Sequence, residues 1–215
     1  MYKNQYKNLN ILYLMKIDKV FYINLEHRSD RKLEIETELY NYGIVDYERF
    51  NAIKHDDIGG VGCAKSHIEV LKIAKEREYK RILIFEDDFQ FIIPKEEFYH
   101  YMQKIEDVDF DVCMLSYHLY QYNELPEMPF LKKVIEAETS SGYIINQHYY
   151  DKLINQISPA IPLLEQTNYH WLYSFDIVWK ELQKIDKWVC FNPKIGIQRA
   201  NSFSDCSKTV NDGNW

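Results

Sequence analysis

Three consecutive acids are the clearest chemical feature of this 215-residue sequence. Glu86, Asp87 and Asp88 directly follow an apolar run at residues 82–85, which is typical of a strand buried in a sheet. Because side chains alternate along an extended chain, Glu86 and Asp88 are expected to point to one side and Asp87 to the other. Two converging carboxylates form a hard-oxygen site that suits Mn²⁺ or Mg²⁺. The alternative is a solvated acidic turn after an edge strand.

An apolar strand followed by acids also occurs in P-loop ATPases and GTPases, which in addition need a glycine-rich loop that ends in Lys-Ser or Lys-Thr. None of the seven glycines is followed by lysine, so the sequence disfavours this class. A metal-dependent phosphohydrolase is compatible with the acids, but the remaining motifs do not favour it.

Composition and charge restrict the partners. The chain is 46% hydrophobic and 27% charged, as in soluble globular proteins, and its formal net charge is −7. Because binding to long nucleic acids requires a basic surface, we expect no nucleic-acid partner. The oligomeric state cannot be read from these quantities.

The cysteines and apolar runs bear on location. The four cysteines are far apart in sequence and predict neither a disulfide framework nor a zinc site, so we expect reduced, buried thiols. No apolar run is long enough to cross a bilayer, although peripheral membrane association stays open. We expect a cytoplasmic protein of a bacterium, or one found in the host cytoplasm or virion if the source is viral.

Apolar runs typical of strands alternate with segments of helical spacing. This alternation predicts an α/β fold with one open, Rossmann-like, mainly parallel sheet and helices on both faces. Residues 1–14 are expected to be an N-terminal extension, disordered or lying before the true start, and residues 15–215 a single domain. Strands are expected at residues 19–25, 48–53, 81–85, 111–116, 140–146 and 187–193.

Helices are expected after the first two strands and later in the chain, at residues 147–156 and 175–183. The first helix should bury Leu33, Thr37 and Tyr40 and end at Gly43. The second should follow a flexible glycine turn at residues 59–62 and bury Ala64, Ile68, Leu71 and Ala74. Residues 159–164 are expected to break the helical structure.

Four segments together resemble glycosyltransferase family 25, the lipooligosaccharide galactosyltransferases and their collagen-hydroxylysine relatives. The matches follow the family's order and extend over roughly residues 17–206. They are VFYINLEHRSDR at residues 20–31, GGVGCAKSHIEVL at 59–71, ILIFEDDF at 82–89 and NPKIGIQRANSFSD at 192–205.

The resemblance implies a GT-A-like fold, a nucleotide-sugar donor and a divalent metal, Mn²⁺ or Mg²⁺. Asp88 would be the direct metal ligand, Glu86 a second ligand or a ribose or water contact, and Asp87 a supporting donor-site residue. The implied reaction moves galactose or glucose from UDP-galactose or UDP-glucose to a saccharide or hydroxyl acceptor, with inversion, in glycan or lipopolysaccharide biosynthesis. The alternative is a non-catalytic protein of the same fold that binds a nucleotide sugar or carbohydrate.

The resemblance also assigns donor-site residues outside the acidic cluster. Arg28 and Arg31 would contact phosphate or ribose, unless they are simply a solvated helix start. Asn24 and Leu25 would offer backbone groups to the base. His67 would be a donor contact or, alternatively, a buried core histidine. Ser66 would join it, and the late segment would add Gln198 and Ser202 near the diphosphate or metal-bound water.

The acceptor side is expected to include Tyr143, His170 and Trp171. Asp176 is the candidate base for the acceptor hydroxyl, and its alternative role is an ordinary acid in a first helical turn. Trp171 would stack on a sugar ring or belong to the core. One departure from the superfamily pattern is that no histidine follows His170, so Gln198, Asp205 or water would complete the metal shell.

Overall fold

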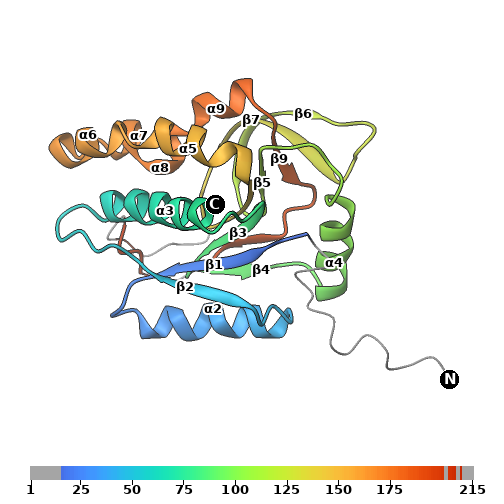
Figure 1. The fold of residues 1–215 in the computed structure, drawn as a ribbon, viewed down its shortest axis with the longest axis horizontal. Coiled ribbons are helices and arrows are strands. Elements are labelled where there is room, and N and C mark those ends of the chain that lie inside the picture. Colours follow the sequence, from blue (N-terminus) through green and yellow to red (C-terminus); the bar gives the residue numbers. More distant parts are fainter. Residues whose placement is uncertain (1–15, 201–202, 207–208, 210–215) are drawn as a thin grey trace.

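The computed structural model of the chain describes residues 16–200, 203–206 and 209. It contains an eight-stranded mixed sheet of order β2-β1-β3-β8-β5-β9-β7-β6, with helices on both faces (Figure 1). The α/β fold class is therefore confirmed. The expected N-terminal extension and Ser202 lie outside the described residues.

The sheet has a parallel half that carries the acids. Strand β1 (Lys19–Asn24) lies between β2 (Tyr47–Asn51) and β3 (Arg81–Glu86) and is parallel to both. Each of β1 and β3 is almost wholly buried, which explains their continuous apolar sequences. The three strands end at one edge of the sheet, on the left in Figure 1.

The other half of the sheet is mixed. Strand β8 (Gly142–Asn146) is antiparallel to both β3 and β5 (Val112–Met114). Strand β9 (Trp188–Phe191) is parallel to β5, and the hairpin of β6 (His118–Glu124) and β7 (Leu131–Glu138) completes the edge. Strands β7 and β8 thus run against the other six.

Helices bury an apolar core on each face of the sheet. One face packs against α2 (Ser29–Asn41) and α4 (Lys95–Lys104), and the opposite face against α3 (Gly59–Glu76) and the later helices (Figure 1). None of the helices among the described residues has the length and apolar character needed to span a bilayer. The later elements are η1 (Gln147–Tyr149), α5 (Tyr150–Ile157), α6 (Ala160–Thr167), α7 (His170–Tyr173), α8 (Phe175–Val178) and α9 (Lys180–Ile185).

The first helix buries a different face from the one expected. Its buried residues are Arg31, Ile35 and Leu39, whereas Leu33 and Tyr40 are 69% and 75% exposed. The spacing of four along the true face was hidden by an arginine, which is buried because it pairs with an acid of the site. The expected end at Gly43 agrees with its positive φ of 70°.

Two other expectations are corrected, and one pair of strands was not foreseen. The glycine segment at residues 59–62 is the first turn of α3, and α6 occupies most of the segment expected to break the helical structure. The β6–β7 hairpin was not foreseen, because most residues of β6 are exposed and its sequence lacks a buried alternating pattern. The expected apolar face of α3 is confirmed by the burial of Ala64, Ile68, Leu71 and Ala74.

A small second sheet returns the late chain to the acids. Strand β4 (Phe89–Phe91) pairs with β10 (Gly196–Gln198), and the Arg199 amide donates to the Asp88 carbonyl at 2.7 Å. Gly196 is required here, since a Cβ atom would lie 2.1 Å from Cζ of Phe89. This pairing brings Gln198 next to the acidic turn.

Candidate active site

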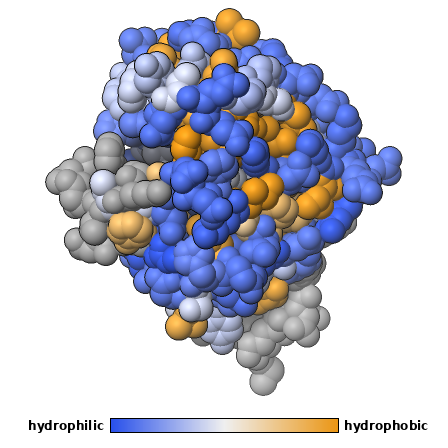
Figure 2. Space-filling view, turned by 90° about the vertical axis from the view of Figure 1, so that its left-hand side faces the viewer, coloured by the Kyte–Doolittle hydropathy of each residue, from blue (hydrophilic) through white to orange (hydrophobic). Residues whose placement is uncertain are grey.

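A cavity of about 590 Å³ opens where β1, β3 and the start of α3 meet. Open α/β sheets bind ligands beyond the carboxyl ends of their strands, and this volume suits a small-molecule ligand. Figure 2 views the molecule from this end, where apolar side chains gather within a mostly hydrophilic surface. The wall includes Leu25, Asp57, Gly59, Gly60, Cys63, His67, Glu86, Asp87, Asp88, Ser140, His170, Asp176 and Gln198.

The acidic cluster lines this cavity, but with a different geometry from the expected one. Strand β3 ends at Glu86, and Asp87 and Asp88 form the turn before β4. Side-chain alternation therefore stops at Glu86, and Asp87 does not point away from the other two acids; all three reach the cavity wall.

Asp87 is held by two side chains from the first strand–helix unit. The Asn24 Nδ2 group donates to its Oδ2 at 2.7 Å, and the Arg31 guanidinium donates to its Oδ1 at 2.9 Å. The same guanidinium lies 3.4 Å from Oδ2 of Asp88. These contacts fix the turn and provide one buried positive charge beside the acids.

The Asp88 carboxylate is buried without enough hydrogen-bond donors or positive charge around it. Its Oδ1 is buried without a hydrogen-bond partner in the described structure. Burial, followed by the charge of Glu86, raises the pKa of Asp88 to about 7. A buried, unpartnered carboxylate oxygen next to a second acid is the arrangement that a hard cation would satisfy, so these residues fit the expected divalent metal.

Glu86 stays ionised for local reasons. Burial alone disfavours its charge, but hydrogen bonds from His67 and Ser140 outweigh burial and lower the pKa of Glu86. Its Oε1 accepts from Ser140 Oγ at 2.5 Å and lies 3.1 Å from His67 Nε2. Glu86, at the end of β3, is thus linked directly to α3 through His67.

His67 is fully buried and held on both ring nitrogens. Its Nδ1 lies 2.9 Å from the Tyr143 hydroxyl, and its ring stacks on Phe175 at 4.4 Å. Its Nε2 faces Glu86 at the cavity wall. His67 thus combines the two alternatives, a core position and a place in the site.

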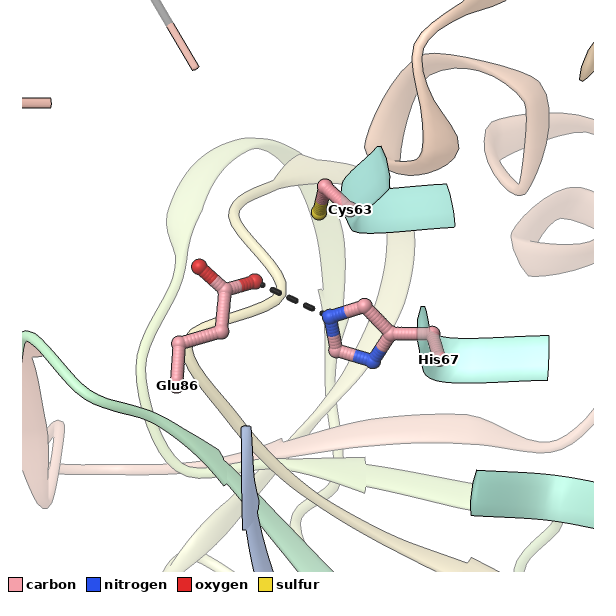
Figure 3. A group of neighbouring side chains, drawn as sticks. All are labelled: Cys63, His67 and Glu86. Carbon is pink, nitrogen blue, oxygen red and sulfur yellow. Dashed lines mark hydrogen bonds and ion pairs between the residues drawn. The ribbon is translucent and has the colours of Figure 1, made fainter. Parts of the chain in front are cut away.

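Cys63 is a site residue that the sequence analysis missed. The ligand-type atoms of Cys63, His67 and Glu86 all lie within 4.8 Å of one another, and the three side chains point toward a common space (Figure 3). Interaction with the nearby Cys206 thiol, followed by burial, raises the pKa of Cys63. The available signal was the spacing of four between Cys63 and His67 on one helix.

Asp176 lies at the start of α8 and lines the cavity. Its Oδ2 accepts the backbone N–H of Thr139 at 3.1 Å. Burial raises the pKa of Asp176, with a further contribution from the nearby charges of Glu138 and Glu86. A carboxylate with a raised pKa at a cavity wall has the properties of a general base.

The side chains of several expected donor residues make contacts within the protein framework. Arg28 does not line the cavity; it pairs with Asp30 and Asp205. The Asn24 side chain is engaged with Asp87 and the Arg28 carbonyl, but Asn24 also lines the cavity, so its expected backbone contact with a base stays a prediction. Ser66 borders the cavity, but its hydroxyl donates to the Gly62 carbonyl and accepts the Ile53 N–H.

On the acceptor side, only His170 lines the cavity. Tyr143 does not; it is fully buried beneath His67, so its expected direct contact with an acceptor is corrected to a contact with that imidazole. Trp171 is not in the core: it is 56% exposed and stacks on Tyr169 at 4.9 Å, outside the cavity wall.

Comparisons with known proteins confirm the resemblance stated from the sequence. The chain is 27% identical over 184 residues to procollagen galactosyltransferase 1-A of Xenopus laevis, and 27% identical over 190 residues to human procollagen galactosyltransferase 2. Each alignment covers 70% of this chain but 30% of the relative, so the chain spans about a third of the length of these proteins. No family model matches the chain.

A solved structure supports the fold. The glycosyltransferase involved in glycosylation of the major capsid of PBCV-1 superposes with a TM-score of 0.51, covering 84% of this chain and 92% of that one. Its sequence identity is 7%, so the likeness concerns the fold.

Proposed function

We propose that this chain is a metal-dependent glycosyltransferase that moves galactose or glucose from a UDP-sugar to a saccharide or hydroxyl acceptor. The observation that carries the proposal is the unpartnered, buried Oδ1 of Asp88 at the wall of a cavity large enough for a nucleotide sugar. Similarity to galactosyltransferases supports the choice of chemistry.

Asp88 and Glu86 would hold the divalent cation, Mn²⁺ or Mg²⁺. When bound, the cation would neutralise the charge that develops on the departing diphosphate. Asp87 keeps its structural partners in this proposal, so that Asn24 and Arg31 hold the turn in position while the neighbouring acids serve the cation.

Asp176 is the proposed base. It would accept the proton of the acceptor hydroxyl as that oxygen attacks the anomeric carbon, and a single displacement of this kind inverts the configuration. Burial beside Thr139 keeps the carboxylate out of bulk water and raises its pKa, which strengthens it as a base. His170, at the same wall, would face the acceptor.

One observation favours the alternative, a non-catalytic nucleotide-sugar-binding protein. Arg28 is engaged with Asp30 and Asp205, and Arg31 with Asp87 and the Phe203 carbonyl. Both guanidinium groups are already engaged within the protein, and of the two only Arg31 lines the cavity, so stabilisation of the leaving group would rest mainly on the cation.

Calorimetric titration with UDP-galactose and UDP-glucose, with and without Mn²⁺, followed by an assay of slow donor hydrolysis, tests the proposal. We expect binding that depends on Mn²⁺, with release of free UDP. Asp88→Asn should remove the metal dependence, whereas Asp109→Asn, a matched change at an exposed acid paired with Lys187, should not. Binding without turnover across acceptor panels would favour the non-catalytic alternative, and unchanged metal dependence in Asp88→Asn would refute the metal assignment.

A further inference from the structure

We propose that Cys63, His67 and Glu86 form a second cation site that prefers thiol-binding metals such as Zn²⁺ and Co²⁺. The site shares Glu86 with the proposed Mn²⁺ site but takes its other ligands from α3. Its existence does not depend on the glycosyl transfer reaction.

Local structure brings the three ligands together. Cys63 and His67 are four residues apart on α3 and therefore lie on one face of the helix, while Glu86 ends the neighbouring strand β3. All three reach the cavity wall, and their ligand-type atoms lie within 4.8 Å of one another (Figure 3).

The separation between the His67 and Glu86 ligand atoms suits a tetrahedral ion. His67 Nε2 and Glu86 Oε1 are 3.1 Å apart. Two ligand atoms bound to zinc at about 2.0–2.1 Å with a tetrahedral angle between them would be roughly 3.3 Å apart. The ion can therefore replace the proton between these two atoms with little movement, and Cys63 would provide the third ligand.

Outer contacts already orient these ligands. The Tyr143 hydroxyl contacts His67 Nδ1, and the Ser140 hydroxyl donates to Glu86. Partners of this kind fix the ring orientation of a metal-binding histidine. The ring is also held by stacking on Phe175. Three protein ligands at a cavity wall leave a fourth position for water or a ligand atom.

The proton balance is simple. The thiol of Cys63 loses its proton when sulfur binds the metal, and that proton leaves to solvent. The proton on Nε2 of a neutral His67 moves to Nδ1, where the Tyr143 hydroxyl accepts it as a hydrogen bond. Glu86 remains a carboxylate throughout. Binding of one ion therefore releases one proton.

Titration of the metal-free protein with Co²⁺ tests this site, because cobalt bound to a thiolate gives a near-ultraviolet charge-transfer band. We expect the band in the wild-type chain, its loss on addition of Zn²⁺, and release of one proton per ion. Cys63→Ser and Cys63→Ala should both lack the band, with far-ultraviolet circular dichroism showing that each variant folds.

The matched control is Cys206→Ser, which removes the neighbouring thiol and should keep the band. Asp88→Asn should also keep the band while losing Mn²⁺ dependence, so the two metal assignments can fail separately. No band in the wild-type chain, or a band that survives in the Cys63 variants and disappears in Cys206→Ser, would overturn the proposal.

Discussion

Asp88 shows how a single side chain can make a folded protein depend on an absent ion. Its carboxylate is removed from water, lies beside Glu86 and has one oxygen without a partner among the described residues. Without a cation, folding therefore favours the protonated acid. The consequences can be measured without any knowledge of the substrate.

Asp88→Asn should stabilise the metal-free protein above neutral pH. An acid whose pKa rises from 3.8 to about 7 on folding contributes stability that is complete below pH 3.8 and is lost as the pH rises through 7. The full shift corresponds to at most about 4 kcal/mol, and a neutral carboxamide avoids this loss. Urea unfolding with a chelator should therefore show the variant more stable at pH 8, by an amount that shrinks at pH 5.

Saturating Mn²⁺ should reverse this order, because the cation stabilises the wild-type site and not the variant. Asp107→Asn is the control, since that acid is 87% exposed and pairs with Lys16 at the surface. Equal pH dependence in Asp88→Asn and the wild-type chain would contradict the environment described for this carboxylate.

Asp176→Asn should separate binding from chemistry. The carboxamide keeps the size of the side chain and the acceptor for the Thr139 N–H but cannot take a proton. Loss of a general base lowers turnover by about 10²–10⁴-fold. Transfer assays should show this loss with little change in calorimetric binding of the donor, while Asp151→Asn, at an exposed ion pair with Lys75, should leave both unchanged. An equal loss of donor binding would assign Asp176 to the donor instead.

At the scale of elements, the start of α3 contains two glycines with different surroundings. A Cβ atom on Gly62 would lie 2.2 Å from the Ile53 carbonyl oxygen, which is backbone, whereas one on Gly60 would lie 3.4 Å from a Leu164 methyl group. The close approach at Gly62 lets α3 pack against the loop after β2, whereas Gly60 faces α6 with room for a methyl group.

Gly62→Ala should lower the free energy of unfolding by about 2 kcal/mol, because the backbone must move to remove the overlap. Gly60→Ala should be neutral or raise it by up to about 1 kcal/mol, since alanine favours helix. Chemical denaturation of the two variants measures the difference. A similar effect at both positions would show that the contact with Ile53 does not constrain the helix.

Elements with a strong local pattern could be predicted from sequence. The apolar runs gave β1 and β3, and spacing gave the buried face of α3. The buried face of α2 was wrong because Arg31 reads as a surface residue until Asp87, 56 positions away, is placed beside it. Burial of a charged group is decided by its partner, and the partner is not visible in the local sequence.

The part of the site that could be predicted from sequence is the acidic motif at the end of strand β3. The acids that the sequence singled out do line the cavity, but their directions differ from the expected ones, because a turn replaces the strand after Glu86. The place of Cys63 beside Glu86 depends on how α3 packs across β3, which no spacing rule provides. The ion pair of Arg28 was unforeseen for the same reason, since its partner Asp205 comes from a distant part of the chain.

At the scale of the whole molecule, the cavity joins residues from Ile23 to Cys206. A ligand that binds only this assembled form stabilises the entire fold. At about 100 times their dissociation constants, UDP and Mn²⁺ should each raise the free energy of unfolding by at most about 2.7 kcal/mol. In thermal melts, UDP and Mn²⁺ together should raise the melting temperature more than UDP with a chelator does. An equal rise in melting temperature would argue against a metal-bridged nucleotide.

The route of the chain through the sheet also has a consequence for biosynthesis. Strand β3 pairs with β8, so that Arg81 meets Asn146, and β4 receives its partner only from residues 196–198. Pairings between segments distant in sequence form slowly, and the edges of the strands stay exposed until their partner strands have formed. A nascent chain on the ribosome would therefore carry its three acids unshielded until nearly 200 residues had emerged. The site that we propose for the donor would be among the last features to form.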